Sequence, residues 1–193
     1  MNPQSTDRRS FLAMTALAGA GGLILVPEPN GAHAAMLLQT TPEQRVKELG
    51  LNLPQPQQAS ATLVPAVLSG NMLYCSGHGP RAEGKNITGK VGADLTPEQG
   101  KDAARLVALN MLSTIRNAAG SLDRVTRLVK TLGMVNAAPD FTGHAGVING
   151  FSEVMIQVFG EQLGKGARSA VGMSSLPGGW AVEIEAIFEV RPA

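Results

Sequence analysis

The sequence is poor in the residues that build disulfide scaffolds and metal centres. Its 193 residues include one cysteine, Cys75, so no disulfide can form within the chain. Of the three histidines, the two that follow residue 34, His78 and His144, have no partner at metal-ligand spacing. We therefore expect a fold held together by packing, with no metal site. Cys75 lies in an apolar run and is interpreted as a buried residue rather than a nucleophile.

Charge is scarce as well, and it is balanced. Charged residues make up 16% of the chain, aromatic residues 4%, and the formal net charge is +1. Lysine and arginine are scattered, without the basic run that binds a phosphate backbone. These shortages argue against a nucleic-acid partner.

The glycine patterns of common cofactor and hydrolase motifs are missing too. Residues 35–193 contain neither a phosphate loop nor the dinucleotide-binding pattern. The segment 172–176 lacks the final glycine of a nucleophile elbow. We therefore expect no cofactor and no serine nucleophile.

The N-terminus has the pattern of an export signal. Paired arginines precede Phe-Leu at 8–12, and a weakly apolar stretch at 13–26 leads to an Ala-x-Ala motif at 32–34. The pattern predicts a twin-arginine signal peptide over residues 1–34 and a mature chain, beginning at Ala35, that is periplasmic or secreted. An uncleaved membrane anchor is the alternative, whereas the cleaved chain is expected to have no stable membrane association.

Residues 35–60 are expected to form a spacer, a short helix and an extended arm. The helix begins at Thr41, a capping residue followed by proline, and Gly50 ends it. The stretch 51–58 is rich in proline and glutamine and has neither helical nor strand periodicity. The arm is therefore expected to be extended.

Residues 61–193 are expected to form one domain. The predicted elements are a hairpin of 64–68 and 72–76, a helix from Thr96 to Gly120, a strand over 125–135, a helix over 140–159 and two strands around a Pro-Gly-Gly turn between 164 and 190. Two helices can cover only one face of so small a sheet. The order therefore predicts an α+β sandwich.

The last predicted strand has one apolar side and one side with three carboxylates, Glu183, Glu185 and Glu189. In a hairpin around Pro-Gly-Gly, Arg168 lies roughly across from Glu183 or Glu185 and shares their face. One interpretation is an ordinary ion pair on a solvated sheet. The other is a site in which Arg168 binds a substrate carboxylate and Glu183 handles protons or water.

This segment resembles the C-terminal signature of the RidA family of imine and enamine deaminases. The resemblance is carried by Ala-Arg-Ser-Ala-Val-Gly-Met-Ser-Ser-Leu-Pro at 167–177 and Ala-Val-Glu-Ile-Glu-Ala at 181–186, while 69–80 is similar to the family's first hairpin and following loop. It implies a chorismate-mutase-like fold, in which two helices cover one face of a mixed sheet. It also implies a homotrimer with active sites in the clefts between subunits.

The resemblance further implies the roles of individual residues. Arg168 would bind the substrate carboxylate through two hydrogen bonds, and Glu183 would position a water molecule or shuttle a proton. Backbone groups near Gly77 and the amide of Asn149 are expected to complete the pocket. The alternative for Asn149 is a surface position on a helix.

Three more positions bear on the implied pocket. His78 follows the first hairpin and is expected either to contact the ligand or to be a solvated loop residue. Ala170 stands where many family members have cysteine, and Leu63 or a neighbour stands where deaminating members carry tyrosine. The missing tyrosine removes a hydroxyl that could handle protons.

The implied function is hydrolytic deamination of reactive imines and enamines of amino acids to keto acids and ammonia, with a small imino or keto acid as ligand. The alternative is a non-catalytic trimeric module that binds a small carboxylate or a protein partner, which the missing tyrosine favours. Ribonuclease activity, a label that the family has carried, is disfavoured because the chain lacks a basic groove with aromatic residues.

Overall fold

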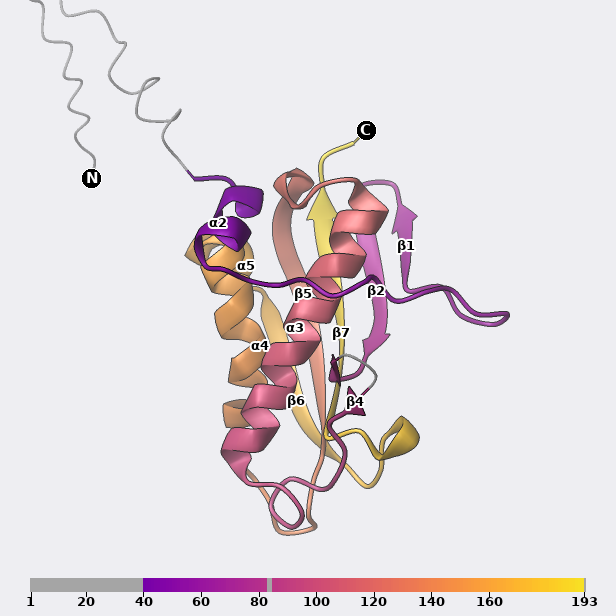
Figure 1. Ribbon diagram of the computed structural model, residues 1–193, viewed down its shortest axis with the longest axis vertical. Coiled ribbons are helices and arrows are strands. Elements are labelled where there is room, and N and C mark those ends of the chain that lie inside the picture. Colours follow the sequence, from indigo (N-terminus) through magenta and orange to yellow (C-terminus); the bar gives the residue numbers. More distant parts are fainter. Residues whose placement is uncertain (1–39, 83–84, 193) are drawn as a thin grey trace, which may run out of the picture. The chain divides into compact units, whose positions relative to one another are not determined.

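The computed structural model describes residues 40–82 and 85–192. The predicted signal peptide, 1–34, therefore lies outside the described residues. The described part contains a five-stranded sheet, and two long helices, α3 and α4, cover one of its faces (Figure 1). No helix in this part of the chain has the length and apolar character needed to cross a membrane.

The helices begin where their capping residues predict. Helix α2, Pro42–Glu48, and helix α3, Pro97–Ala119, each follow a threonine that accepts a hydrogen bond from the third residue of its helix. In α3 the partners are Thr96 and Gln99, and the Gln99 side chain in turn accepts a hydrogen bond from the Thr96 backbone. Gly120 ends α3 in the left-handed conformation, at φ 82°.

The sheet has the order β1-β2-β7-β5-β6. Its strands are β1, Ala66–Ser69; β2, Met72–His78; β5, Val125–Asn136; β6, Ala167–Met173; and β7, Val182–Val190. Strands β1 and β2 form the predicted hairpin, in which Gly70 takes a positive φ of 60°. A separate two-stranded ribbon joins β3, Arg81–Ala82, to β4, Lys85–Asn86.

The predicted hairpin between the last two strands is wrong. Strand β6 pairs in parallel with β5, and β5 separates it from β7. The connection from β5 to β6 runs through α4, His144–Phe159, and the short α5, Glu161–Gly164, as a parallel pair requires. The Pro-Gly-Gly segment forms a short 3₁₀ turn, η2, Pro177–Gly179, in a loop that Lys90 holds by donating a hydrogen bond to the Ser174 carbonyl (2.6 Å).

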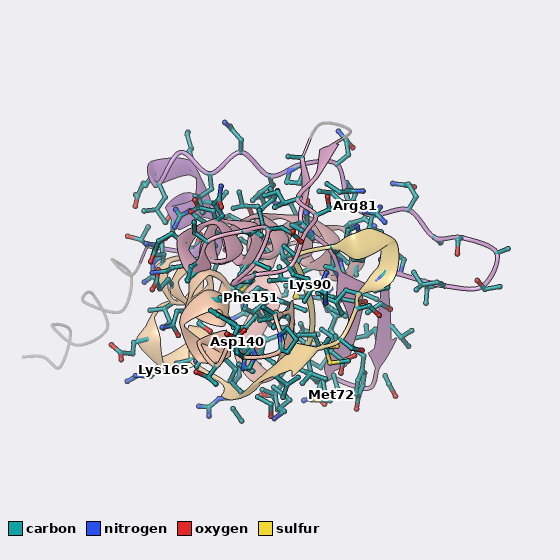
Figure 2. The ribbon with its side chains drawn as sticks, turned by 90° about the horizontal axis from the view of Figure 1, so that it is seen from below. Met72, Arg81, Lys90, Asp140, Phe151 and Lys165 are labelled. Carbon is teal, nitrogen blue, oxygen red and sulfur yellow. The ribbon has the colours of Figure 1, made fainter. Side chains whose placement is uncertain are left out.

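The core lies between the sheet and the two helices, and the β7 residues that face it are buried: Val182, Ile184, Ala186, Phe188 and Val190. Phe151 of α4 lies in this interior, fully buried (Figure 2). The other side of β7 carries Glu183, Glu185, Ile187 and Glu189 and has no helix over it. We call this side the open face of the sheet.

Candidate functional site

Arg168 lies on β6, at the edge of the sheet, and its side chain points to the flank of α4. Its Nη1 atom donates hydrogen bonds to Asn149 Oδ1 at 2.9 Å and to Ser152 Oγ at 3.0 Å. Both partners are neutral, and no carboxylate of the described residues forms an ion pair with Arg168. One nitrogen is thus fixed by the protein, while Nε and Nη2 are left to bind an anion in two-pronged fashion.

A cavity of about 310 Å³ adjoins this guanidinium. Its lining includes Asn149, Ser152, Thr131 and Ile156. The volume suits a small organic acid, at the lower end of the range for ligand pockets. The other charged residues of the lining, Glu153 and Lys165, are paired with Lys101 and Glu161 at 2.8 Å each. Arg168 therefore contributes the uncompensated charge.

Glu183 occupies a different environment, on the open face of β7. It packs directly on the backbone of Gly77, so closely that a Cβ atom at this glycine would collide with Glu183 Oε1. Burial raises the pKa of Glu183 above its usual range, and the neighbouring Glu185 carboxylate adds to the shift. A raised pKa makes the ionised carboxyl group a stronger proton acceptor, which suits a group that takes up and returns a proton.

Arg168 and Glu183 do not share a face within one protomer, contrary to the sequence prediction. Thr131 of β5 pairs with Arg168 on one side and with Ala186 on the other, and Ala186 points into the core. Arg168 is therefore on the helix side of the sheet, while Glu183 is on the open face with β5 between them. The two side chains can contact one ligand only if a second copy of the chain supplies one of them.

His78 is a core residue of strand β2, so neither predicted position of its side chain, against a ligand or solvated in a loop, is found. The side chain is 1% exposed. Nδ1 lies 2.6 Å from the Ser76 carbonyl and Nε2 lies 2.8 Å from Thr114 Oγ1. Burial lowers the pKa of His78, which keeps the ring neutral. Because a carbonyl only accepts, Nδ1 carries the proton and Nε2 accepts from Thr114.

Ala170 lies two residues beyond Arg168 on the same side of β6. It is half-buried against the core and does not line the cavity of Arg168. Its predicted contact with substrate stays a prediction. Ser152, by contrast, was not predicted, although its position one helical turn after Asn149 could have indicated it.

Leu63 lies in the arm before β1 and is 41% exposed. The cavity beside Arg168 has no tyrosine in its lining. Tyr74, the single tyrosine of the chain, lies on the open face, where it lines a shallow depression of about 220 Å³ with Lys130 and Glu185. Among the described residues, no tyrosine of this cavity therefore takes the place of the one that deaminating relatives are expected to carry near Leu63.

The open face exposes large apolar side chains beside its carboxylates. Val67 is 50% exposed, Tyr74 45% and Val171 39%. Lys130 Nζ, on the same face, donates a hydrogen bond to Ser169 Oγ at 2.9 Å. Among the described residues, no group of histidine, cysteine and acidic side chains is arranged to hold a metal ion.

Comparisons with known proteins agree on the family. Residues 43–177 match the family model described as "YjgF/chorismate_mutase-like, putative endoribonuclease". Protein TCP17 of Trypanosoma cruzi is 42% identical over 147 residues, which are 76% of this chain and 92% of that protein. The chain belongs to the YjgF/RidA-like family and has its chorismate-mutase-like fold.

Two solved structures have folds similar to that of this chain. The protein Atu1372 of Agrobacterium tumefaciens, of unknown function, is 43% identical, with a TM-score of 0.72 over 78% of this chain and 92% of that one. A protein of Shewanella oneidensis, which shares the endoribonuclease description, is 28% identical, with a TM-score of 0.74 over 78% of this chain and 99% of that one. These comparisons thus show the family and the fold of this chain.

Proposed function

We propose that the protein hydrolyses reactive imines and enamines of amino acids to keto acids and ammonia. The observation that carries the proposal is the guanidinium of Arg168. Two neutral side chains hold it beside a cavity, and no acid among the described residues forms an ion pair with it. Such an arrangement suits a substrate carboxylate, which would fix the electrophilic carbon one bond away.

Glu183 provides the acid–base group in this proposal. It would take a proton from a water molecule as the water oxygen bonds to the C=N carbon, and give that proton to the nitrogen as the π electron pair moves there, forming a carbinolamine. The carboxylate would then take the proton of the carbinolamine hydroxyl as the C=O bond of the keto acid forms. Glu183 gives this proton to the nitrogen as the C–N bond breaks, so ammonia leaves and the carboxylate is regenerated.

The site in this proposal lies between protomers of a homotrimer. Two observations support a shared site: Arg168 and Glu183 are on opposite faces of one sheet, and the open face exposes Val67, Tyr74 and Val171. A second copy packed on the open face would cover these apolar side chains and could bring its own Arg168 to Glu183.

Export through the twin-arginine pathway, to the periplasm or beyond the cell, is the second part of the proposal. It is supported by the motif at residues 8–12 and the Ala-x-Ala sequence at 32–34. Fractionation of cells that express the full chain tests it. Lys–Lys in place of Arg8 and Arg9 should leave the uncleaved protein in the cytoplasm. Equal processing of both forms would contradict export by this route.

The direct test is ammonia and keto-acid release from 2-iminobutanoate, generated in situ from threonine by a dehydratase. The protein should accelerate release over buffer, and Arg168→Ala should reduce kcat/KM by about a hundredfold or more because the carboxylate loses its charged partner. Arg105→Ala, at an exposed arginine of α3 that lines no cavity described above, is the matched control. A rate equal to that of buffer would refute the deaminase proposal.

A complementation experiment tests the sharing of the site. Arg168→Ala and Glu183→Gln chains, each inactive alone, are co-expressed with different tags and purified through both. If each site takes Arg168 from one protomer and Glu183 from its neighbour, every trimer that contains both chains has one site of its three with both native residues. Activity near that fraction supports the shared site, whereas inactive mixed oligomers place both residues in one protomer's site.

The competing function is a trimeric module that binds a small carboxylate without turnover. The absence of tyrosine from the Arg168 cavity favours it. Calorimetry with 2-oxobutanoate separates the two functions. Saturable binding that Arg168→Ala removes, combined with imine hydrolysis at the rate of buffer, would select the binding module.

A further inference from the structure

The largest cavity described in this structure is not the one beside Arg168. A cavity of about 1,050 Å³ lies between the extended arm, residues 52–58, and helix α3. Its floor includes Leu106 and Asn110 of α3, and Gly79, Arg81 and Ala82 close one end. In Figure 2, Arg81 lies on the opposite side of the structure from Lys165, which lines the Arg168 cavity. The two cavities are therefore separate.

The arm is held against α3 by a hydrogen bond and by apolar contacts. Ser113 of α3 donates a hydrogen bond to the Pro54 carbonyl, and Leu51 and Leu53 pack against the core. The arm crosses α3 in Figure 1 along the helix side of the sheet. The cavity is therefore formed before any ligand arrives, which lowers the ordering cost of binding.

The lining combines amide groups with aliphatic surface. Five amide side chains, Asn52, Gln55, Gln57, Gln58 and Asn110, surround the space together with Leu53, Pro54, Pro56 and Leu106. The Nδ2 atom of Asn110 donates hydrogen bonds to the carbonyls of Gly79 at 3.0 Å and Arg81 at 3.1 Å. Its Oδ1 atom is therefore left to accept a hydrogen bond from a ligand. Amides of this kind match the donors and acceptors of a ligand's own amide groups.

Arg81 is the charged residue of the lining. Its guanidinium carbon lies 5.4 Å from the centroid of the Trp180 ring, a cation–π distance. Trp180 in turn packs on Gly79, where a Cβ atom would lie 2.5 Å from the ring. No carboxylate of the described residues pairs with Arg81. The stacked guanidinium is thus held in place with its hydrogen-bond donors available for an anion.

We propose that the cavity between the arm and α3 is a second ligand site, for an acylated amino acid or a similar organic monoanion. The ligand's carboxylate binds Arg81, its amide groups pair with the amide side chains, and its aliphatic body packs on Leu53 and Leu106. The volume is about three times that of the Arg168 cavity, so the ligand is larger than a simple imino or keto acid. The proposal does not depend on the deaminase reaction.

The test uses the full chain and N-acetyl-L-leucine as the probe. Trp180 is the single tryptophan of the chain, so its fluorescence reports on the Arg81 end of the cavity. Titration should give a saturable change in emission and a matching heat by calorimetry. The uncharged N-acetyl-L-leucinamide should bind roughly tenfold more weakly or worse, because it cannot form the charged hydrogen bonds with Arg81.

Two variants decide whether the binding belongs to this cavity. By calorimetry, Arg81→Gln should weaken N-acetyl-L-leucine to the level of the amide, while Arg168→Gln should bind it as the native chain does. Thermal unfolding of both variants checks that they are folded. The proposal is overturned if no probe saturates, if Arg81→Gln binds with native affinity, or if Arg168→Gln alone abolishes binding. Failure here leaves the deaminase assay unaffected, since that assay depends on Arg168.

Discussion

The two faces of strand β7 have different roles, one in the hydrophobic core and the other in the candidate site. One face carries five buried apolar residues, from Val182 to Val190, that pack against α3 and α4. The other carries Glu183, Glu185 and Glu189, of which Glu183 packs on Gly77. Because successive residues of a strand point to opposite sides, the same nine residues serve the core and the candidate chemistry independently. Substitutions on the two faces should therefore affect different measurements.

The largest expected effect is on the core face. Phe188→Ala leaves a cavity against Phe159 and the helices, and should lower the free energy of unfolding by about 3–5 kcal/mol. Glu185→Ala, on the exposed side of the same strand, should change it by less than about 1 kcal/mol. Urea denaturation of both variants measures the difference. Equal losses of unfolding free energy in the two variants would show that both faces of the strand contribute to stability.

A smaller effect, confined to function, is expected at Glu183. Glu183→Gln keeps the shape of the side chain but cannot accept a proton, so kcat for imine hydrolysis should fall by about a hundredfold. Binding of 2-oxobutanoate should persist, since Arg168 is untouched. The free energy of unfolding should not fall, because burial already disfavours the charged form of Glu183. A variant that turns over at the native rate would exclude Glu183 as the acid–base group.

The open face should also determine assembly. Val67→Asp replaces an apolar side chain, half exposed in the protomer, with a charged one. If a second copy covers this side chain, burying the new carboxylate should weaken association by roughly ten- to a hundredfold. Sedimentation velocity at several concentrations measures it, with Lys47→Asp on α2 as the control. An unchanged oligomer would place the interface elsewhere.

Local sequence signals predicted the helices and the first hairpin, because their causes are local. Thr41 and Thr96 each stand before a proline and three residues before a glutamine, so the capping geometry is determined within one turn. The Ser-Gly-Asn turn determines the β1–β2 hairpin in the same way. The two-helix layer over one face then follows from the order of elements.

The pairing of β6 could not be predicted from the Pro-Gly-Gly motif. Strand partners depend on contacts distant in the chain, and here the helix between β5 and β6 favours a parallel pair over the turn-mediated one. The error affected the site directly, because a hairpin would have placed Arg168 and Glu183 on one face. The contact of Arg168 with Asn149, in contrast, depends on α4 lying over β6 and on no feature of the sequence near either residue.

The position of His78 was missed for a related reason. Leu73 and Cys75 alternate into the core, so simple alternation places Gly77 inward and His78 outward. A β-bulge between Cys75 and His78 shifts the phase. As a result Gly77 comes under Glu183 while His78 turns into the core. One irregularity thus separates a candidate catalytic position from a structural one.

The smallest expected effect follows from this buried histidine and appears in the pH dependence of stability. The pKa of His78 is lowered in the folded state, so the unfolded chain binds a proton first, near pH 6.5. The free energy of unfolding should therefore be constant above that pH and decrease below it, by at most about 1.4 kcal/mol per pH unit from this residue. Urea denaturation at pH 7.5 and 5.5 measures this decrease. From the higher to the lower pH, the free energy of unfolding should fall less in His78→Gln than in the native chain. A slope unchanged by His78→Gln would show that protonation of His78 is not coupled to unfolding.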